Sequence, residues 1–194
     1  MEHFYTIQGE GAYTGHAAYF IRLGGCDVGC HWCDVKDSWT MEGHTQMTVN
    51  ELVDLVKSTP AKIVVITGGE PLMHDLTALT KKLKEAGLRT HIETSGAHPL
   101  SGTWDWICLS PKKFKEPLPV FFDIAHELKI IVFNTSDFLY AELNKSKIKN
   151  QKSKIYLQPE WSKRDEMMPL IVDFVKLHPE WQISLQTHKY LNIP

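Results

Sequence analysis

Short apolar runs alternate along the chain with longer segments in which apolar residues recur at helical spacing. Residues 62–67 form a continuous run rich in β-branched side chains, which is typical of a strand buried in a parallel sheet. The segment before this run opens with a capping box, Thr48-Val49-Asn50-Glu51, and predicts an amphipathic helix that ends at Pro60. The segment after the run predicts a second helix, capped by Asp75 and stopped by Gly87.

The same alternation continues to the end of the chain. Further strands are predicted at 18–23, 88–94, 104–109, 129–133, 154–157 and 181–185, and further helices at 120–127, 136–144 and 164–177. We expect Pro169 to kink or split the last helix. Such alternation predicts right-handed βαβ units around a parallel sheet. About six units are too few for a closed eight-fold barrel of about 250 residues. The expected α/β fold is therefore a curved, partly open barrel of about six strands, and a doubly wound open sheet is the competing architecture.

Polar motifs follow the predicted strands at the point where each strand ends. They are the cysteine loop after residue 23, Thr67-Gly68-Gly69-Glu70-Pro71, Glu93-Thr94-Ser95, Ser110-Pro111-Lys112 and Gln158-Pro159. Because ligands bind at the carboxyl ends of the strands in parallel α/β folds, these motifs are expected to build one site. Each motif by itself has an ordinary alternative as a turn or a strand-end polar residue.

Composition and charge narrow the class of protein. With 194 residues, 43% hydrophobic and 23% charged, the chain is expected to form one soluble domain over residues 1–194. A net charge of −2 gives no electrostatic case for nucleic acid or for an anionic membrane. The first residues do not resemble a signal peptide, and no apolar run is long enough to span a bilayer. Clustered cysteines then indicate a metal site in a reducing compartment, so we expect a cytoplasmic protein.

Three cysteines, Cys26, Cys30 and Cys33, lie within eight residues at Cys-x3-Cys-x2-Cys spacing. Soft thiolates select iron–sulfur clusters or zinc. An ordinary 4Fe-4S cluster takes four cysteines, so three local thiolates would leave one iron free for another ligand. The alternative is a zinc knuckle with His31 or the distant Cys108 as fourth ligand. Otherwise Cys108 is expected to be a buried apolar thiol.

The cysteine spacing, with Trp32 before the last cysteine, resembles the radical S-adenosylmethionine superfamily. Further motifs narrow the resemblance to the 7-carboxy-7-deazaguanine synthase (QueE) family. They are Ile7-Gln8-Gly9-Glu10-Gly11, Phe20-Ile21-Arg22, the strand-end motifs above and the ending Gln186-Thr187-His188-Lys189. The resemblance implies a shortened, open radical SAM barrel of the (βα)6 type, usually dimeric. It also implies a 4Fe-4S cluster on the three cysteines, with S-adenosylmethionine bound at the free iron.

The implied reaction is that of a lyase in queuosine biosynthesis. The substrate would be 6-carboxy-5,6,7,8-tetrahydropterin, and the products 7-carboxy-7-deazaguanine and ammonia. An electron donor such as a flavodoxin would reduce the cluster, S-adenosylmethionine would be cleaved, and a radical formed at C6 of the pterin would rearrange. Two other classes stay open: an activating enzyme for a glycyl-radical protein, which shares the cysteine triplet, and a zinc-binding module without enzymatic activity.

The resemblance also implies roles for individual residues. Candidate proton-transfer or polar partners of the substrate are Glu10, Glu93 and His188. Substrate contacts would come from Ile7, Gln8, Gly9, Arg22, Thr67 and Pro194, the last through its carboxylate. S-adenosylmethionine contacts would come from Trp32, Cys33, Asp34, Gly69, Glu93, Ser110, Pro111, Lys112, Gln158, Pro159, Glu160 and Trp161. For Glu10, between two glycines, a tight turn with a solvated carboxylate is the alternative.

One position departs from the family pattern. Many members carry Thr or Ser two residues after the last cluster cysteine, where its hydroxyl binds magnesium, but this chain has Val35. A valine side chain cannot coordinate a hard cation, which prefers oxygen. Magnesium is therefore expected from the family and uncertain from the residues. Asp34, backbone carbonyls, water or the substrate could hold it, or Lys36 could replace its charge.

Overall fold

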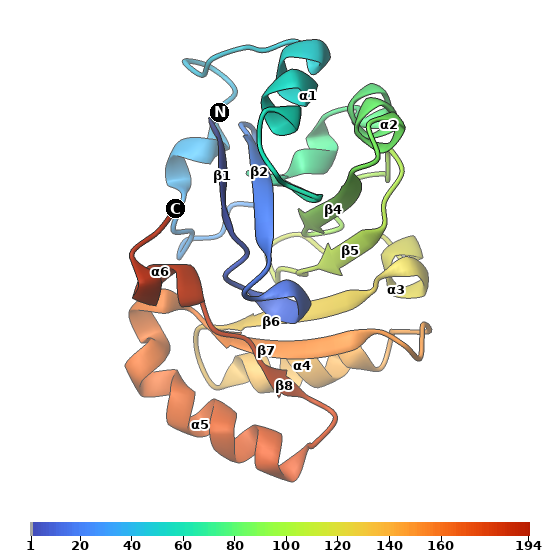
Figure 1. Cartoon of the computed structure of the whole chain (residues 1–194). Coiled ribbons are helices and arrows are strands. Elements are labelled where there is room, and N and C mark those ends of the chain that lie inside the picture. The colour runs from blue at the N-terminus through green and yellow to red at the C-terminus, as the bar shows by residue number, and fades with distance from the viewer. Residues whose placement is uncertain (1) are drawn as a thin grey trace.

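The computed structural model describes residues 2–194 and contains one eight-stranded sheet in the order β1 to β8. The strands are β1 (Glu2–Ile7), β2 (Ala17–Leu23), β3 (Ile63–Gly68), β4 (Arg89–Thr94), β5 (Trp106–Leu109), β6 (Glu127–Val132), β7 (Lys154–Pro159) and β8 (Gln182–Ile183). β1 pairs antiparallel with β2, and every later neighbour is parallel. Within residues 2–194 β1 and β8 do not pair, so the curved sheet stays open (Figure 1). The predicted α/β, partly open barrel is confirmed.

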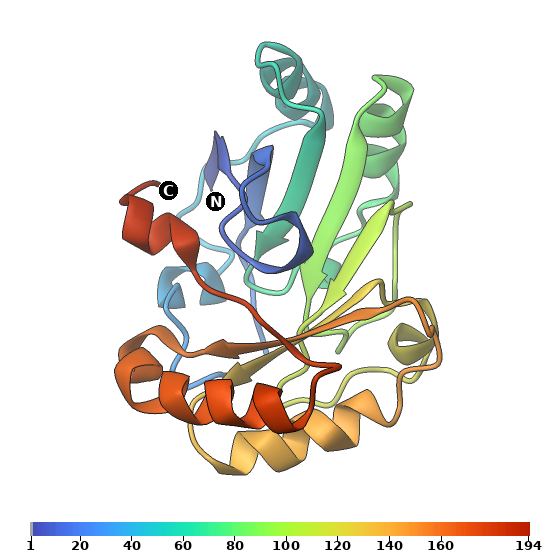
Figure 2. The same ribbon diagram turned by 60° about the horizontal axis from the view of Figure 1, so that its bottom comes forward.

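Helices cover the outer face of this sheet. The α-helices are α1 (Val49–Lys57), α2 (Thr77–Glu85), α3 (Val120–Ile124), α4 (Ser136–Lys145), α5 (Arg164–Leu177) and α6 (Thr187–Leu191). The 3-10 turns are η1 (Gly11–Tyr13), η2 (Lys36–Trp39), η3 (Pro71–Met73) and η4 (Trp161–Lys163). Figure 2 shows α4 and α5 side by side under β6 and β7, whereas α6 lies beside the two chain ends. No helix in the described part of the chain combines the length and apolarity that crossing a bilayer requires.

Alternation along the strands separates two apolar regions. In β2 and β3 the side chains of Tyr19, Ile21, Val64 and Ile66 point outward into the main core with the helices. The residues between them point inward and form a second, smaller cluster of Ala18, Phe20, Ile63 and Val65, packed by Phe4 and Tyr13. The interior is thus filled with apolar side chains toward the start of β3. The carboxyl ends of the strands are left for polar residues.

Several element boundaries differ from the sequence prediction. The capping box at Thr48 is present, but the N-cap of α2 is Leu76 rather than Asp75, whose carboxylate accepts from the Thr77 amide at 3.0 Å. Pro169 lies inside α5, which runs unbroken from Arg164 to Leu177, so the predicted split is wrong. The predicted strands match β2 to β8, because the strand predicted at 181–185 contains the short β8, and β1 is the strand that was not predicted. α6 falls in a tail for which no element was predicted.

β6 begins at Glu127, which the sequence prediction placed in a helix. Leu128, Ile130 and Val132 are fully buried in the outer core, whereas the alternate positions Glu127 and Lys129 are buried and polar. Charged side chains at the inward positions disguise the strand, because the usual pattern puts charge on the solvent face. The boundary error put Glu127 outside the strand, whereas Lys129 lay inside the predicted strand but was not recognised as an interior residue.

Candidate active site

A cavity of about 270 Å³ opens at the carboxyl ends of the strands. This volume is more than ten times the roughly 10–15 Å³ that one buried water needs, so the cavity can hold an organic ligand. Its lining takes one or more residues from each strand end or following loop from β1 to β7. Every site residue predicted from the sequence lines this cavity except Pro111. The expectation that the strand-end motifs meet is confirmed by this geometry.

The cysteine loop forms one wall of the cavity, where Cys26, Cys30 and Cys33 all contribute to the lining. Main-chain hydrogen bonds fix the loop: the Gly25 amide donates to Ser38 at 2.8 Å, and the Cys33 amide donates to Cys30 at 3.0 Å. All three are free thiols. Burial raises the pKa of Cys26, and it raises the pKa of Cys30 to about 11 against the opposing charge of Lys112.

The spacing of the three sulfurs tests which metal group they fit. Among residues 2–194, the one set of three potential ligand atoms mutually within 4.8 Å is Glu142, His178 and Glu180. At least two of the cysteine sulfurs therefore lie more than 4.8 Å apart. A single tetrahedral zinc with Zn–S bonds of about 2.3 Å would bring them to about 3.8 Å. Three thiolates on one loop are instead the soft donor set that an iron–sulfur cluster takes.

Neither of the fourth ligands considered for zinc lines the cavity. His31 is exposed and packs edge-on against Phe114 and Phe133, with ring centroids at 5.4 and 5.1 Å. Cys108 is buried on β5, where its thiol lies 3.5 Å from the Glu127 carboxylate, and burial raises its pKa well above the usual range. Cys108 is buried as expected, but its surroundings are charged rather than apolar.

The glycines after β3 pack directly on the cysteine loop. The Gly69 amide donates to Leu23 at 3.0 Å, and the next amide, that of Glu70, donates to Gly25 at 2.8 Å. A Cβ at Gly69 would collide with the carbonyl groups of Gly25 and Ser38. Only glycine allows this approach, which places bare backbone on the cavity wall.

Glu70 anchors the same loop to the end of β4. Its carboxylate is 1% exposed and accepts four hydrogen bonds, from the Leu72 amide (3.1 Å), the Thr94 hydroxyl (2.6 Å), the Ser95 amide (2.8 Å) and the Ser95 hydroxyl (2.5 Å). Such saturation by protein donors indicates a fixed positioning group. The sequence motif contains Glu70, but spacing alone does not indicate that role.

Two further strand ends complete this half of the cavity. Lys112 folds back so that its ammonium donates to the Ser110 carbonyl (2.5 Å) and hydroxyl (2.7 Å). Burial lowers the pKa of Lys112. The Gln158 side chain on β7 accepts a hydrogen bond from the Ser184 hydroxyl at 2.7 Å. The Glu160 carboxylate accepts a hydrogen bond from the Ser162 main-chain amide. Pro111, the one predicted residue outside the lining, lies between Ser110 and Lys112 in the chain.

The opposite half of the cavity carries a network of buried charges. The Glu10 carboxylate binds the Lys129 ammonium and accepts from the Gln186 amide at 2.9 Å. Glu93 accepts from the Gln8 amide at 2.9 Å and lies 3.5 Å from Lys129. Burial raises the pKa of Glu10, but Lys129 and Gln186 outweigh it and lower that pKa to about 2. Glu10 is therefore a carboxylate held inside the site, and the alternative of a solvated turn residue is wrong.

The N-terminal and C-terminal segments close this half. The Gly9 carbonyl accepts from the Thr187 amide (2.9 Å) and hydroxyl (3.0 Å), and a Cβ at Gly9 would collide with the His188 ring. Burial lowers the pKa of His188, opposed by Glu10. The Pro194 main-chain oxygen accepts from the Thr6 hydroxyl at 3.4 Å. This end of the cavity is thus assembled from residues almost the whole chain apart.

Arg22 lies at the end of β2 with its side chain in the cavity, as alternation predicts. Its Nε is 2.9 Å from the Glu2 carboxylate, and its guanidinium carbon is 6.0 Å from the centre of the Phe4 ring. Guanidinium matches a carboxylate as a two-pronged donor. The lining residues not foreseen from the sequence include Phe4, Trp39, Ile131 and, above all, Lys129.

Comparison with known proteins identifies the family. Residues 20–111 match the model of the Radical SAM superfamily. The chain is 57% identical over 194 residues to the 7-carboxy-7-deazaguanine synthase of Flavobacterium psychrophilum, covering all of this chain and 91% of that protein. It is 50% identical over 192 residues to the Synechocystis enzyme of the same name, covering 99% and 91%. The chain belongs to the 7-carboxy-7-deazaguanine synthase family.

A solved structure agrees with this family. The crystal structure of QueE from Escherichia coli superimposes with a TM-score of 0.82 at 34% identity, covering 95% of this chain and 91% of that one. Membership of the 7-carboxy-7-deazaguanine synthase family confirms the radical SAM enzyme class expected from the motifs. It sets aside the two alternatives, a glycyl-radical activating enzyme and a zinc-binding module.

Proposed function

We propose that this chain converts 6-carboxy-5,6,7,8-tetrahydropterin to 7-carboxy-7-deazaguanine with release of ammonia, as a radical S-adenosylmethionine lyase of queuosine biosynthesis. The observation that carries this is one cavity lined both by three thiols and by buried carboxylates and a guanidinium. The thiols suit an iron–sulfur cluster, and the carboxylates and guanidinium suit a small polar heterocycle bearing a carboxylate.

Cys26, Cys30 and Cys33 would hold the 4Fe-4S cluster. When bound, the reduced cluster and S-adenosylmethionine supply an organic radical that abstracts hydrogen from the substrate. The chain's own contribution on this side is binding and orientation. Gly69 offers bare backbone, and Trp32, Asp34, Ser110, Lys112, Gln158, Pro159, Glu160 and Trp161 surround the remaining space. Pro111 keeps the turn that aims Ser110 and Lys112.

On the substrate side, Arg22 and Thr67 at neighbouring strand ends would receive the pterin carboxylate. Main-chain groups of Ile7 and Gly9, with the Gln8 amide, would contact the ring edge. Glu10 and Glu93 would accept hydrogen bonds from ring N–H groups, and His188, whose pKa is lowered by burial, would be uncharged at neutral pH and able to accept a proton. Pro194 would close the pocket.

Magnesium does not fit the residues of this chain. The Val35 side chain has no oxygen, and its carbonyl already accepts from the Ser38 amide (3.0 Å) and hydroxyl (2.6 Å). The Asp34 carboxylate is paired with the Lys189 ammonium at 2.7 Å, while Lys36 lies over the Trp39 ring. Magnesium needs near-octahedral oxygen ligation. We therefore infer that no magnesium is needed at Asp34, where Lys189, and not Lys36, supplies the positive charge.

The wider setting follows from the same chemistry. All eight strands of the described chain belong to one sheet, which supports a single radical SAM domain over residues 1–194. Cluster-binding thiols require a reducing compartment, which supports a cytoplasmic location. The cluster requires a one-electron donor, for which a flavodoxin is our candidate. A homodimer is proposed from the family pattern.

The decisive experiment is anaerobic. The reconstituted protein is expected to hold about four irons per chain, against one zinc for a structural tetrahedral site. After reduction, incubation with S-adenosylmethionine and the carboxy-tetrahydropterin should release the deazaguanine product and ammonia. Cys30→Ala should abolish cluster assembly, whereas Cys108→Ala, a matched change outside the cavity, should preserve it. Absence of product from a fully loaded wild-type protein would refute the proposed function.

A further inference from the structure

Lys129 is a buried cation that the proposed reaction leaves without a role. It lies at an inward position of β6, is 4% exposed and lines the cavity. An isolated ammonium at such a site carries a large desolvation penalty. Because burial lowers its pKa but Glu10 and Glu93 raise it further, the Lys129 pKa lies well above its usual range and the side chain stays charged.

The contacts of Lys129 join two residues that are far apart in the chain. Its ammonium binds one oxygen of Glu10 and lies 3.5 Å from one oxygen of Glu93. The other oxygen of each carboxylate accepts a hydrogen bond from a glutamine side chain. The Gln186 side-chain amide donates to Glu10, and the Gln8 side-chain amide donates to Glu93, both at 2.9 Å. Both carboxylates are thus held from two sides at the edge of the cavity.

We propose that Lys129 is a positioning residue for the reaction: its ammonium holds the Glu10 and Glu93 carboxylates at a fixed spacing as hydrogen-bond acceptors for the substrate. The inference rests on the proposed function, since it assigns both carboxylates to substrate N–H groups. Without the cation, the two like charges would repel and separate. The acceptors would then no longer match a rigid heterocycle.

The charges around Lys129 determine what its removal does. The titratable groups near it are Glu10 after β1, Glu93 on β4, Cys108 on β5, Lys112 after β5, Glu127 on β6 and His188 on α6. Burial raises the pKa of Glu127, and Lys129 opposes that rise. Removing Lys129 leaves the Glu10, Glu93 and Glu127 carboxylates close together without their cation. These carboxylates, titrating together, therefore bind a proton at higher pH than in the wild type.

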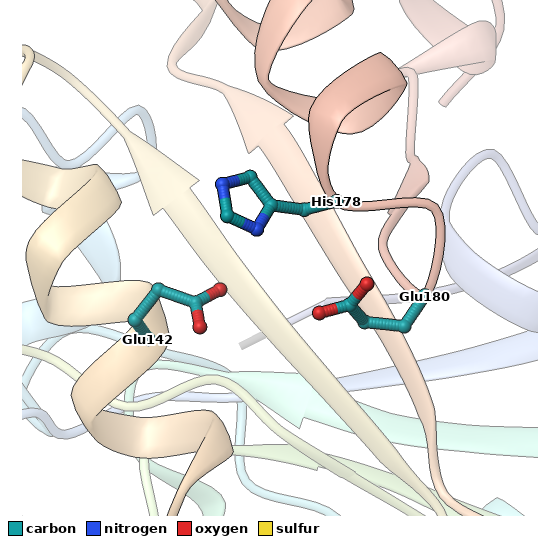
Figure 3. Close-up of side chains that lie close together, drawn as sticks. All are labelled: Glu142, His178 and Glu180. Carbon is teal, nitrogen blue, oxygen red and sulfur yellow. The ribbon is translucent and has the colours of Figure 1, made fainter.

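The chain contains a matched control in Lys145, which also bridges two glutamates. Its ammonium lies 3.0 Å from Glu142 and also binds Glu180, and Figure 3 shows these two carboxylates facing His178. This cluster is outside the cavity. Because Lys145 and the Trp181 indole N–H, 2.6 Å from Glu142, already use the carboxylates, we assign no metal to it. Lys145→Met removes a comparable pair of contacts without touching the site.

The test compares Lys129→Met, Lys145→Met and the wild-type holoenzyme in kcat/KM between pH 5.5 and 9. Lys129→Met should lower kcat/KM at pH 7 by about 10²-fold and move the acidic limb of its profile up by about one pH unit. Lys145→Met should leave both unchanged. In Lys129→Ala, added propylammonium should restore at least tenfold of the lost rate, while 1-propanol should not. A purely structural lysine would show neither the pH shift nor the cation-specific rescue.

The double variant Glu10→Gln/Lys129→Met removes one charge of each sign. It replaces Lys129→Met in the test if that single variant does not fold. It should show the loss of kcat/KM without the pH shift, because the excess carboxylate is gone. An unchanged pH profile in the folded Lys129→Met protein, or equal rescue by propanol, would overturn the proposal. Absence of product from the wild type would instead count against the proposed function, so the two failures are distinct.

Discussion

Replacing Glu70 by glutamine tests whether a buried carboxylate holds the glycine loop after β3 against the end of β4. Glutamine preserves the shape of the side chain, so packing is unaltered and only hydrogen bonding and charge change. Each carboxylate oxygen accepts from one main-chain N–H and one hydroxyl: Leu72 and Thr94 on one oxygen, and Ser95 twice on the other.

The magnitude follows from those four bonds. A hydroxyl can rotate to accept from the new NH2 group, but a main-chain N–H cannot, so one buried N–H is left facing a donor. Leaving it unpaired costs about 1–3 kcal/mol. The three bonds that survive lose the strengthening due to charge, at about 1 kcal/mol each, while the lower desolvation cost of a neutral amide offsets part of this. The net loss expected is about 2–4 kcal/mol.

Urea denaturation of the metal-free protein measures this directly. Glu70→Gln should lower the midpoint without changing the slope, and should lower Tm by about 4–16 °C for a chain of this size. The control is Glu116→Gln, because the Glu116 side chain is 63% exposed and makes only a 3.5 Å ion pair with Lys147. That change should stay within about 0.5 kcal/mol. If Glu70→Gln also stays within that limit, the reasoning about the four bonds is refuted.

Three further outcomes follow from the site and its surroundings. Chelation of magnesium should change wild-type turnover by less than about twofold. The double variant Val35→Thr/Lys189→Met should instead acquire a magnesium requirement. A strict magnesium requirement in the wild type would contradict the inference that Lys189 takes the place of the ion at Asp34. Gly69→Ala should displace the cysteine loop and reduce S-adenosylmethionine affinity at least tenfold by equilibrium dialysis. The comparison is Gly15→Ala, which strains a backbone with a φ of +88° but meets no atom within 4 Å and lies outside the cavity, so it should leave that affinity unchanged. Burial lowers the pKa of His91 to about 4, so the unfolded chain gains a proton first as pH falls from about 6.5 to 4. Stability should therefore decline over that window by up to about 3 kcal/mol, and His91→Phe should flatten the decline in urea titrations.

The residues that were found from the sequence share a physical property. Cysteines at fixed spacing, paired glycines and strand-end carboxylates are unusual in their positions, and parallel pairing brings the carboxyl ends of β2 to β8 to one edge. Their convergence could therefore be predicted without knowing how the sheet curves. Packing details such as the saturation of Glu70 could not, because its partners Thr94 and Ser95 follow a different strand.

Lys129 and Glu127 were missed for a different reason. They occupy inward positions of β6, but a charged residue alternating with Leu128 and Ile130 has the pattern of a strand with one solvated face. Only the curvature of the sheet turns that face into an interior. The identity of the partner also requires the fold, since Glu10 follows β1, a strand that was not predicted from the sequence.

The open edge of the sheet explains why residues from the two ends of the sequence line one cavity. An unpaired strand edge exposes main-chain donors and acceptors, and β1 and β8 do not pair within the described residues. Instead, isolated hydrogen bonds cross the gap between β1 and β8. The Gly11 main-chain amide donates to the Ser184 hydroxyl at 2.9 Å, and the Thr187 main-chain amide donates to the Gly9 carbonyl at 2.9 Å. Figures 1 and 2 both place α6 beside the C-terminus, on the side of the sheet where β1 lies. Because these contacts also position Glu10 and His188, loosening α6 should weaken substrate binding before it unfolds the barrel.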